Sequence, residues 1–244
     1  MHAFGQILKT ETKLYLRDIP SLLLILLLPT VILVVLGLVP TLRVPDPKFG
    51  GVSFITYFTP SLLVASLAMV AVNILPSVLA TYRERGILRR LATTPINPAA
   101  LLLAQLLLAL AGIVASAVLL ALVARLAFGS PLPQHPLGFA AALLLGTAAL
   151  LALGLLVAAV ARTNRSAQAL TVPLFMLVMF FGGVYLPRFM LPDLVADLGA
   201  YTPPGVQALL DAWTGTAPHP LHLGIMATIA LAAGAGAAKL FRWE

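Results

Sequence analysis

The chain contains six apolar runs that are each long enough to cross a lipid bilayer as a helix, which needs about 20 mainly apolar residues. The runs lie at residues 20–39, 57–80, 99–124, 137–161, 169–186 and 220–238. Hydrocarbon offers backbone N–H and C=O groups no partner, so a spanning segment must satisfy them within its own helix. Because 9% of the residues are charged, against about 25% in a typical soluble domain, we expect an all-α polytopic membrane protein with six transmembrane helices.

The basic residues are distributed unevenly among the segments that connect these runs. If the amino terminus is cytosolic, the inner segments hold 11 and the outer segments hold 4 of the 15 Lys and Arg residues. Lys and Arg concentrate on the cytosolic side of membrane proteins. We therefore predict a multi-pass protein of the cell (inner) membrane with both termini in the cytosol. The net charge of +7 then reflects orientation, and no nucleic-acid partner is expected.

Residues 1–18 mix apolar and polar side chains and are too polar to cross a membrane. The apolar side chains are Phe4, Ile7, Leu8, Leu14 and Tyr15, and the polar ones are Lys9, Glu11, Lys13, Arg17 and Asp18. Such a mixture is typical of a helix that lies in the plane of the membrane interface. We predict an interfacial amphipathic helix that leads into the first span, and a disordered tail is the alternative.

A dense, mostly basic segment, residues 81–98, separates the second run from the third. Each Arg would cost about 2.5–3.5 kcal/mol at the centre of a bilayer, so the segment must lie in water. Ile87, Leu88 and Leu91 recur among the arginines at helical spacing, which predicts a short amphipathic helix. Its apolar face has two candidate partners, a cytosolic protein and the lipid headgroups. A basic cluster that serves membrane orientation alone is the third interpretation.

The connection between the fifth and sixth runs, residues 187–219, is long, rich in proline and still largely apolar. This pattern predicts two short helices at about 192–200 and 204–213 that dip into the outer leaflet or cap the spans. Backbone at that depth must be covered by protein or must line a cavity. A plain surface loop is the alternative, and the apolar content argues against it.

A few polar, small and proline residues interrupt the apolar runs. The polar ones are Asn73, Gln105, Ser116, Gln168 and Thr171. Each is expected to form an interhelical hydrogen bond worth about 1 kcal/mol, or to mark a translocation path. Close helix packing is expected at Ala142, Gly146, Gly154 and Ala158, and helix kinks at Pro29, Pro76 and Pro173.

Recognisable catalytic and metal-binding patterns are missing from the sequence. It contains no G-x-x-x-x-G-K-[ST] loop, no G-x-S-x-G elbow, no H-E-x-x-H and no cysteine. His219 and His222 are three residues apart, but without a nearby third ligand we interpret them as interfacial histidines and expect no metal site. No Asp, Glu or Lys falls well inside a span, which argues against a proton-driven pump. We therefore predict that the chain is not itself an enzyme, has no catalytic residues and takes its energy from another polypeptide.

Three features of the chain combine into a recognisable layout. An amphipathic segment precedes six spans, an E-R-G-x-L-R-x-L-x-x-T-P pattern runs from Glu84 to Pro95, and a G-G-x-Y-x-P…L-P…Y-T-P-P pattern runs from Gly182 to Pro204. Together they resemble the permeases of type-2 ATP-binding-cassette (ABC-2) exporters, which include daunorubicin-resistance-type drug exporters and polysaccharide exporters. The resemblance covers the whole chain and implies a single ABC-2 type transmembrane domain over residues 1–244.

The resemblance implies a separate energy source and a second permease. In that family the segment after the second span forms a coupling helix that docks on a cytosolic ABC ATPase. The ATPase contacts implied here are Arg83, Glu84, Arg85, Gly86, Leu88, Arg89 and Leu91. Two ATPase copies and two permease subunits, as a homodimer, are expected in a lipid membrane. ATP and magnesium would be bound by the ATPase, and no cofactor is expected in this chain.

The resemblance also implies where a translocation path lies. Spans 1, 2 and 5 line the path in that family, and the re-entrant outer helices form its upper gate. The expected path and gate residues are Asn73, Phe175, Phe181, Tyr185, Pro187, Asp193 and Tyr201.

The cargo expected from this layout is a hydrophobic drug-like or lipid-like molecule. Sugar chains favour stacking on aromatic rings, and aromatic residues make up 7% of the chain and are scarce in spans 1, 3 and 4. Export of a polysaccharide or lipid-linked glycan is the alternative within the family. From a different class, a channel unrelated to ABC transporters or an immunity membrane protein stays open. A channel would need buried ions or a polar pore, and neither is evident, whereas an immunity protein would not need a coupling segment.

Overall fold

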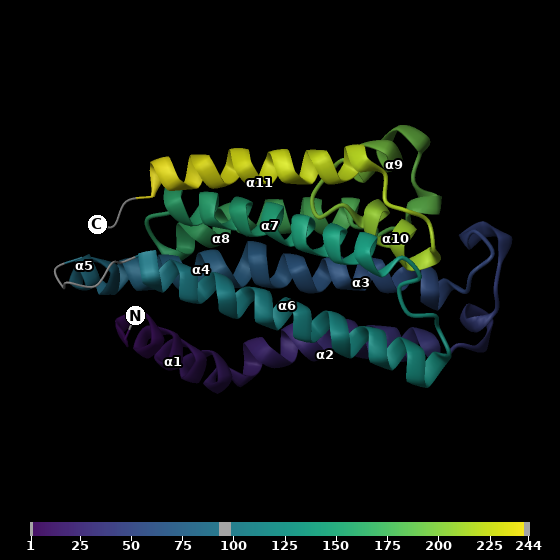
Figure 1. The fold of residues 1–244 in the computed structure, drawn as a ribbon, viewed down its shortest axis with the longest axis horizontal. Helices are drawn as coiled ribbons and strands as arrows, with labels where there is room; N and C mark the ends of the chain where they lie inside the picture. The colour runs from purple at the N-terminus through teal and green to yellow at the C-terminus, as the bar shows by residue number, and fades with distance from the viewer. Residues whose placement is uncertain (1, 93–98, 242–244) are drawn as a thin grey trace.

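The computed structural model describes residues 2–92 and 99–241 of the chain. Most of these residues are helical, and the long helices lie nearly parallel in an elongated bundle (Figure 1). Within the described residues, the extended structure is limited to one isolated antiparallel bridge between Pro45 and Ser53. The prediction of an all-α polytopic membrane protein is therefore confirmed.

Five helical segments within the described residues are long and apolar enough to cross a membrane. They are α2 (Ile19–Gly37), the continuous segment Phe54–Glu84, α6 (Ala99–Phe128), α7 (Pro136–Val160) and α11 (Pro220–Leu240). Phe54–Glu84 consists of α3 (Phe54–Ala68), η3 (Met69–Ile74) and α4 (Leu75–Glu84). These segments correspond to five of the six predicted spans.

The remaining predicted span, residues 169–186, corresponds to α8 (Asn164–Phe181). This helix begins earlier than predicted, with a capping box formed by Thr163 and Ser166. Its first turns carry Asn164, Arg165 and Gln168, which lower its overall apolar character. It packs against α3, η3 and α4 within the bundle. A membrane crossing by α8 stays a prediction.

The segment Phe54–Glu84 forms the centre of the bundle. In its most apolar window 67% of the residues are buried, against 22% for α2 and 17% for α11. Its middle portion, η3, is a π-helix in which the N–H of Leu75 donates to the carbonyl of Val70. Pro76 follows directly and lacks an N–H, so a wider turn lets the helix continue past the missing donor. The distortion predicted at Pro76 therefore takes the form of a π-helix.

Small residues on α7 allow other segments to approach closely, as the sequence predicts. A Cβ atom built on Gly154 would lie 1.9 Å from the carbonyl oxygen of Ala71 in η3. A Cβ on Gly146 would lie 2.3 Å from the carbonyl oxygen of Pro204. Both distances are far below van der Waals contact, so α7 can pack at these points because it carries no side chain there.

The two short helices predicted between the last two spans are present as α9 (Asp193–Ala200) and α10 (Val206–Thr214). α10 is packed between α3 and α7 rather than lying on the surface. Leu209 and Trp213 are fully buried, and the Trp213 ring meets Phe139 edge-on at 5.4 Å. The alternative of a plain surface loop is therefore wrong for this segment. α9 lies further out and exposes Leu194 and Leu198.

The polar residues of the spans behave in two ways. Ser116 on α6 donates to Ser66 (2.8 Å) and to the carbonyl of Ile25 (3.2 Å), which links α6 to α3 and α2. Gln105 on α6 also bonds across to another helix. The predicted interhelical hydrogen bonds are confirmed for these two residues. Thr171 instead bonds within its own helix, to the carbonyl of Gln168.

Different helices lie at the two ends of the bundle (Figure 1). One end holds α1 (His2–Arg17), α5 (Ile87–Ala92) and the carboxyl-terminal end of α11 (Figure 1). We call this the inner end, after its predicted cytosolic side. The other end holds α9 and α10 and is called the outer end (Figure 1).

Candidate coupling surface and translocation path

The predicted coupling helix is present as α5, which follows α4 after a sharp turn. Gly86 forms this turn with φ at +67°, a left-handed conformation that side chains disfavour. Its N–H donates to the carbonyl of Arg83, and its own carbonyl accepts from Arg90. The space around Gly86 is open, so within this chain the glycine is needed for its conformation. Residues 93–98 of the predicted segment lie outside the described part.

Three consecutive residues at the end of α4, Tyr82, Arg83 and Glu84, each bond to a different helix, and we call them the α4 junction. The Tyr82 hydroxyl donates to a carboxylate oxygen of Glu11 on α1 at 2.8 Å. Gln105 of α6 donates to the same oxygen at 2.6 Å. Successive residues of a helix point about 100° apart, which lets one short stretch reach several neighbours.

Arg83 joins α4 to the end of α7. Its Nη1 donates to the carbonyl of Ala158 at 2.8 Å and also to the carbonyl of Ala161. The last carbonyls of a helix have no intrahelical donor and carry partial negative charge, so a guanidinium is a favourable partner. The guanidinium also lies over the ring of Phe241, 5.1 Å from its centroid.

Glu84 joins α4 to the beginning of α8. One of its carboxylate oxygens accepts a hydrogen bond from the backbone N–H of Asn164 at 2.9 Å. The first N–H groups of a helix are unsatisfied, and a negative charge there is stabilising. Ser77, two turns back on α4, donates to the Asn164 side chain at 2.8 Å. The inner end of α4 is therefore tied to α1, α7 and α8 at once.

The predicted coupling residues differ in what they offer a partner. Arg85 is exposed, whereas Leu88 is 1% exposed and packs inside this chain. Arg83 and Glu84 make the intramolecular bonds described above. The side chains of Arg89 and Leu91 lie outside the described part. The roles of these residues toward an ATPase stay predictions.

Helix α1 is amphipathic, but its faces differ from the predicted division. Glu11, expected on the polar face, is 8% exposed, and Leu14, expected on the apolar face, is 50% exposed. Burial raises the pKa of the Glu11 carboxyl, while its hydrogen bonds from Tyr82 and Gln105 act in the opposite direction. The pattern of α1 alone did not predict this burial, because the partners of Glu11 lie 71 and 94 residues away in sequence.

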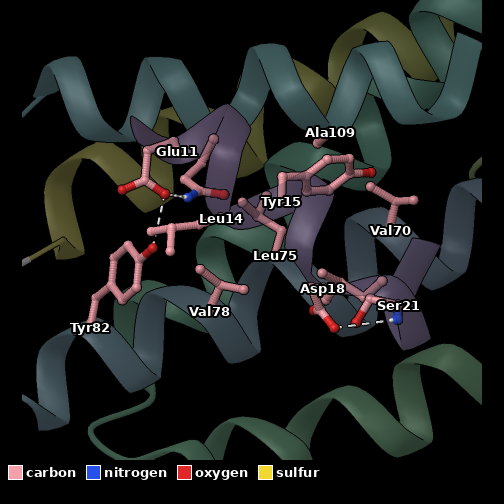
Figure 2. Close-up of a pocket in the computed structure, with 12 residues that line it drawn as sticks. Glu11, Leu14, Tyr15, Asp18, Ser21, Val70, Leu75, Val78, Tyr82 and Ala109 are labelled. Carbon is pink, nitrogen blue, oxygen red and sulfur yellow. Dashed lines mark hydrogen bonds between the residues drawn. The ribbon is translucent and has the colours of Figure 1, made fainter. Parts of the chain in front are cut away.

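A cavity of about 170 Å³ lies beside Glu11, enclosed by α1, the start of α2, η3, α4 and α6 (Figure 2). Figure 2 shows Glu11 and Tyr82 at one end of this cavity and Asp18 and Ser21 at the other. The lining in full is Glu11, Leu14, Tyr15, Asp18, Ser21, Val70, Ile74, Leu75, Val78, Tyr82, Gln105 and Ala109. We call this cavity the α1 pocket.

Asn73, predicted on the path, lies in η3 and lines a neighbouring cavity together with Asp18, Ser21 and Ser77. This cavity shares Asp18 and Ser21 with the α1 pocket. Asn73 therefore lies beside the connection between α1 and α2.

The outer end contains one half-buried cation, Arg188. Its Nη2 donates to the carbonyl of Ala196 at 2.7 Å, and its Nη1 is buried with no hydrogen-bond partner. Burial lowers the pKa of Arg188, and the charges of Asp211 and Asp197 oppose that change. Burial likewise raises the pKa of Asp211, against a hydrogen bond of 2.6 Å from Gln207.

The other predicted path and gate residues are partly brought together. Phe181 packs near Gly199 of α9 and meets the neighbouring Phe180 ring edge-on. Tyr201 is exposed and meets His222 edge-on at 5.1 Å. The side chains of Tyr185 and Asp193 are also exposed. Pro187 precedes the short helix η4 (Arg188–Met190), whereas Phe175 packs against the core inside α8.

The sequence analysis did not predict the hydrogen bond from Tyr82 to Glu11 or the α1 pocket. It also did not predict the hydrogen bond from the half-buried Arg188 to the carbonyl of Ala196. A signal existed for Arg188, because it is the one Lys or Arg residue in the predicted outer segment 187–219. No comparable signal marks the meeting of Glu11 with Tyr82 and Gln105, because three separate helices contribute to it.

Comparison with known proteins identifies the family of the chain. The family model described as ABC-2 type transporter matches residues 2–203, which is most of the chain. Searches of curated proteins and of solved structures return no match. The matched region begins with α1 and contains the α4 junction, α5 and the segment through α9. The chain belongs to the ABC-2 type transporter family and is a membrane permease component of an ABC transporter.

Proposed function

We propose that the chain is the permease subunit of an ATP-driven exporter that moves hydrophobic, drug-like or lipid-like molecules out of the cell. A separate ATPase subunit supplies the energy and holds ATP and magnesium. Family membership supports the transporter part of this proposal. The observation that carries the coupling part is the α4 junction, because it links the segment expected to meet the ATPase to α1, α7 and α8.

The α4 junction suits the transmission of a movement from α5 into the bundle. α5 is joined to α4 through the Arg85–Gly86 turn, so a displacement of α5 pulls directly on Glu84 and its neighbours. Hydrogen bonds to charged groups are directional and are worth about 1.5–3 kcal/mol each, so they hold the attached helix ends in place. A pull on α5 therefore reaches the inner ends of several spans together.

A second permease copy completes the path in this proposal. α2 and α8 expose apolar side chains along their length, among them Leu24, Leu28, Met176 and Leu177. Lipid or a second copy of the chain must cover these faces, since apolar surface this extensive is not stable in water. A twofold pair is the commonest symmetry for such assemblies. A path bounded by these side chains suits an apolar cargo.

The coupling is tested by co-purification with the ATPase. A tagged chain is isolated in mild detergent, and the amount of co-purified ATPase subunit and its ATP hydrolysis are measured. Arg85→Glu reverses an exposed charge at the expected contact, and Lys48→Glu reverses an exposed charge at the outer end as the matched control.

The wild-type chain and the Lys48→Glu variant are expected to retain the ATPase in equal amounts, and the Arg85→Glu variant is expected to lose it. An oligomer of the wild-type chain without ATPase, or full retention by Arg85→Glu, would contradict the proposal. Monodisperse behaviour of all three proteins in gel filtration serves as the control for folding.

A further inference from the structure

The α1 pocket has two chemically different parts. Leu14, Val70, Leu75 and Val78 provide an apolar middle, and carboxylates stand at both ends of the cavity (Figure 2). Leu14 is half exposed, so the apolar part opens toward the surroundings of the bundle. A cavity of about 170 Å³ is smaller than the range of about 300–1,000 Å³ common for ligand sites. A ligand would therefore place part of its volume inside and leave the remainder in the adjoining lipid.

The polar groups of the pocket offer negative charge, and the lining includes no Lys, Arg or His. Tyr82 and Gln105 both donate to Glu11, so these donors are already occupied. The Tyr15 hydroxyl is buried without a hydrogen-bond partner. Asp18 makes one weak contact of 3.4 Å, to the N–H of Ser21. The Tyr15 hydroxyl lies against Gly112 of α6, which does not line the pocket, so an incoming ligand meets the two carboxylates.

Glu11 is a buried acid that no cation of the described residues neutralises. It is 8% exposed, and the uncharged side chains of Tyr82 and Gln105 donate hydrogen bonds to it. Burial of an ionised carboxylate without an opposite charge is costly, and a bound cation offsets that cost. The ring of Tyr15 lies in the same pocket, and an aromatic face attracts a cation electrostatically.

We propose that the α1 pocket binds an organic cation with an apolar body, which enters from the inner leaflet. Two sources share this chemistry, a free hydrophobic cation and the amine headgroup of a membrane lipid. The binding assignment stands on the pocket itself, and the view that the bound cation is cargo rests on the proposed export function. Neither Glu11 nor Asp18 belongs to the predicted coupling or gate residues, so this site is additional to both.

Binding is tested on the purified chain in lipid nanodiscs without any ATPase, with tetraphenylphosphonium as the probe. Tetraphenylborate has nearly the same size and shape but the opposite charge, so it controls for nonspecific apolar binding. The double variant Glu11→Gln, Asp18→Asn removes both charges while keeping hydrogen-bond acceptors at both positions. Asp197→Asn removes an exposed charge from α9 at the outer end and is the matched control.

The wild-type chain and Asp197→Asn are expected to bind tetraphenylphosphonium saturably, at least about tenfold more tightly than the double variant, a difference of about 1.4 kcal/mol. Tetraphenylborate should show no saturable binding. Equal affinity of the wild-type chain and the double variant for the phosphonium, or saturable borate binding, would overturn the proposal. Val78→Trp fills the pocket without changing any charge and should also abolish binding; undiminished affinity of this variant would place the cation elsewhere.

The two sources are separated by lipid composition. Wild-type binding is compared between nanodiscs of phosphatidylethanolamine and nanodiscs of an uncharged glycolipid that carries no amine. Tighter phosphonium binding in the amine-free bilayer identifies the lipid headgroup as a competing occupant, and equal binding identifies a free cation. Because no ATPase is present, loss of ATPase coupling leaves these results unchanged, and loss of binding leaves ATPase co-purification unchanged.

Discussion

The inner and outer ends of the bundle are held together by different kinds of contact. At the inner end, Glu11, Arg83 and Glu84 make polar bonds between helices, with partners 71 to 94 residues away in sequence. At the outer end, the polar bonds of Arg188 and Asp211 span eight and four residues. Longer-range bonds at this end join Thr56 to Ser130 at 2.9 Å and the N–H of His135 to the carbonyl of Ala212 at 2.9 Å, and aromatic rings pack beside them.

Pairs of aromatic rings are concentrated at the outer end. Trp213 is fully buried between α3 and α7. Phe49 meets the rings of Phe54, Tyr57 and Phe189 at centroid distances of 5.2–5.6 Å. Ring packing tolerates small shifts better than directional hydrogen bonds do. We therefore expect the inner end to move as one unit and the outer end to rearrange its packing.

The largest expected effect comes from removing the central ring of the outer end. Trp213→Ala leaves a cavity between α3, α7 and α10, and large-to-small changes of this kind cost about 3–5 kcal/mol. We expect a large drop in the thermal melting midpoint with unchanged co-purification of the ATPase. Trp213→Phe keeps a ring against Phe139 and should recover most of the loss. A variant that melts normally but loses the ATPase would reverse the comparison between the two ends.

Removing the cation of the α4 junction should have a smaller effect on stability and a larger one on coupling. Arg83→Ala leaves the carbonyls of Ala158 and Ala161 without this donor, at a cost of about 1.5–3 kcal/mol. We expect ATPase co-purification to persist while the stimulation of ATP hydrolysis by the permease falls. Arg162→Ala, an exposed residue at the same end, is the control and should leave both quantities unchanged. Full stimulation with Arg83→Ala would refute a role for this residue in transmission.

The turn between α4 and α5 is sharpened by a single glycine. Gly86→Ala must adopt φ near +67°, which costs about 1–2 kcal/mol for a residue with a Cβ. Gly5→Ala lies inside α1 in open space and should instead stabilise by about 0.5–1 kcal/mol. Thermal melting of the two variants in the same detergent measures this difference in sign, and equal shifts would contradict the assigned turn.

The smallest expected effect is a pH dependence at the inner end. Burial raises the folded-state pKa of Glu11, and the groups that face it are Tyr82 from α4 and Gln105 from α6. The folded chain then retains a proton that the unfolded chain has lost, so stability falls as pH rises from the unfolded to the folded pKa of Glu11. Glu11→Gln should flatten this part of the melting profile, and Asp197→Asn should not. A profile unchanged by Glu11→Gln would show that another group titrates there.

The sequence was sufficient to predict those elements that depend on residues close together in the chain. Run length predicted the spans that the structure contains as long apolar helices, and proline punctuation predicted α9 and α10 within about two residues. The glycines of α7 predicted close packing, which Gly146 and Gly154 confirm. These features depend on residues that are neighbours in the chain.

Features that depend on distant residues were not predictable in the same way. Glu11 is buried against Tyr82 and Gln105, and the pattern of α1 alone shows it only as one of several polar residues. Leu88 was expected to meet a partner, yet it is buried in this chain by residues that its own segment does not reveal. The α1 pocket likewise combines α1, α2, η3, α4 and α6, so it becomes visible when these segments are assembled.

The most direct test of the central claim is a pair of distances measured by pulsed electron spin resonance in the assembled complex, before and after trapping with ATP. The chain contains no cysteine, so cysteines introduced at exposed positions Lys13, Arg165 and Asp197 can be labelled specifically. Dilution with unlabelled permease restricts the signal to distances within one subunit. The α4 junction as described predicts that the Lys13–Arg165 distance between α1 and α8 stays constant while the Lys13–Asp197 distance changes. A change in the Lys13–Arg165 distance as large as that in Lys13–Asp197 would show that the inner end does not move as one unit.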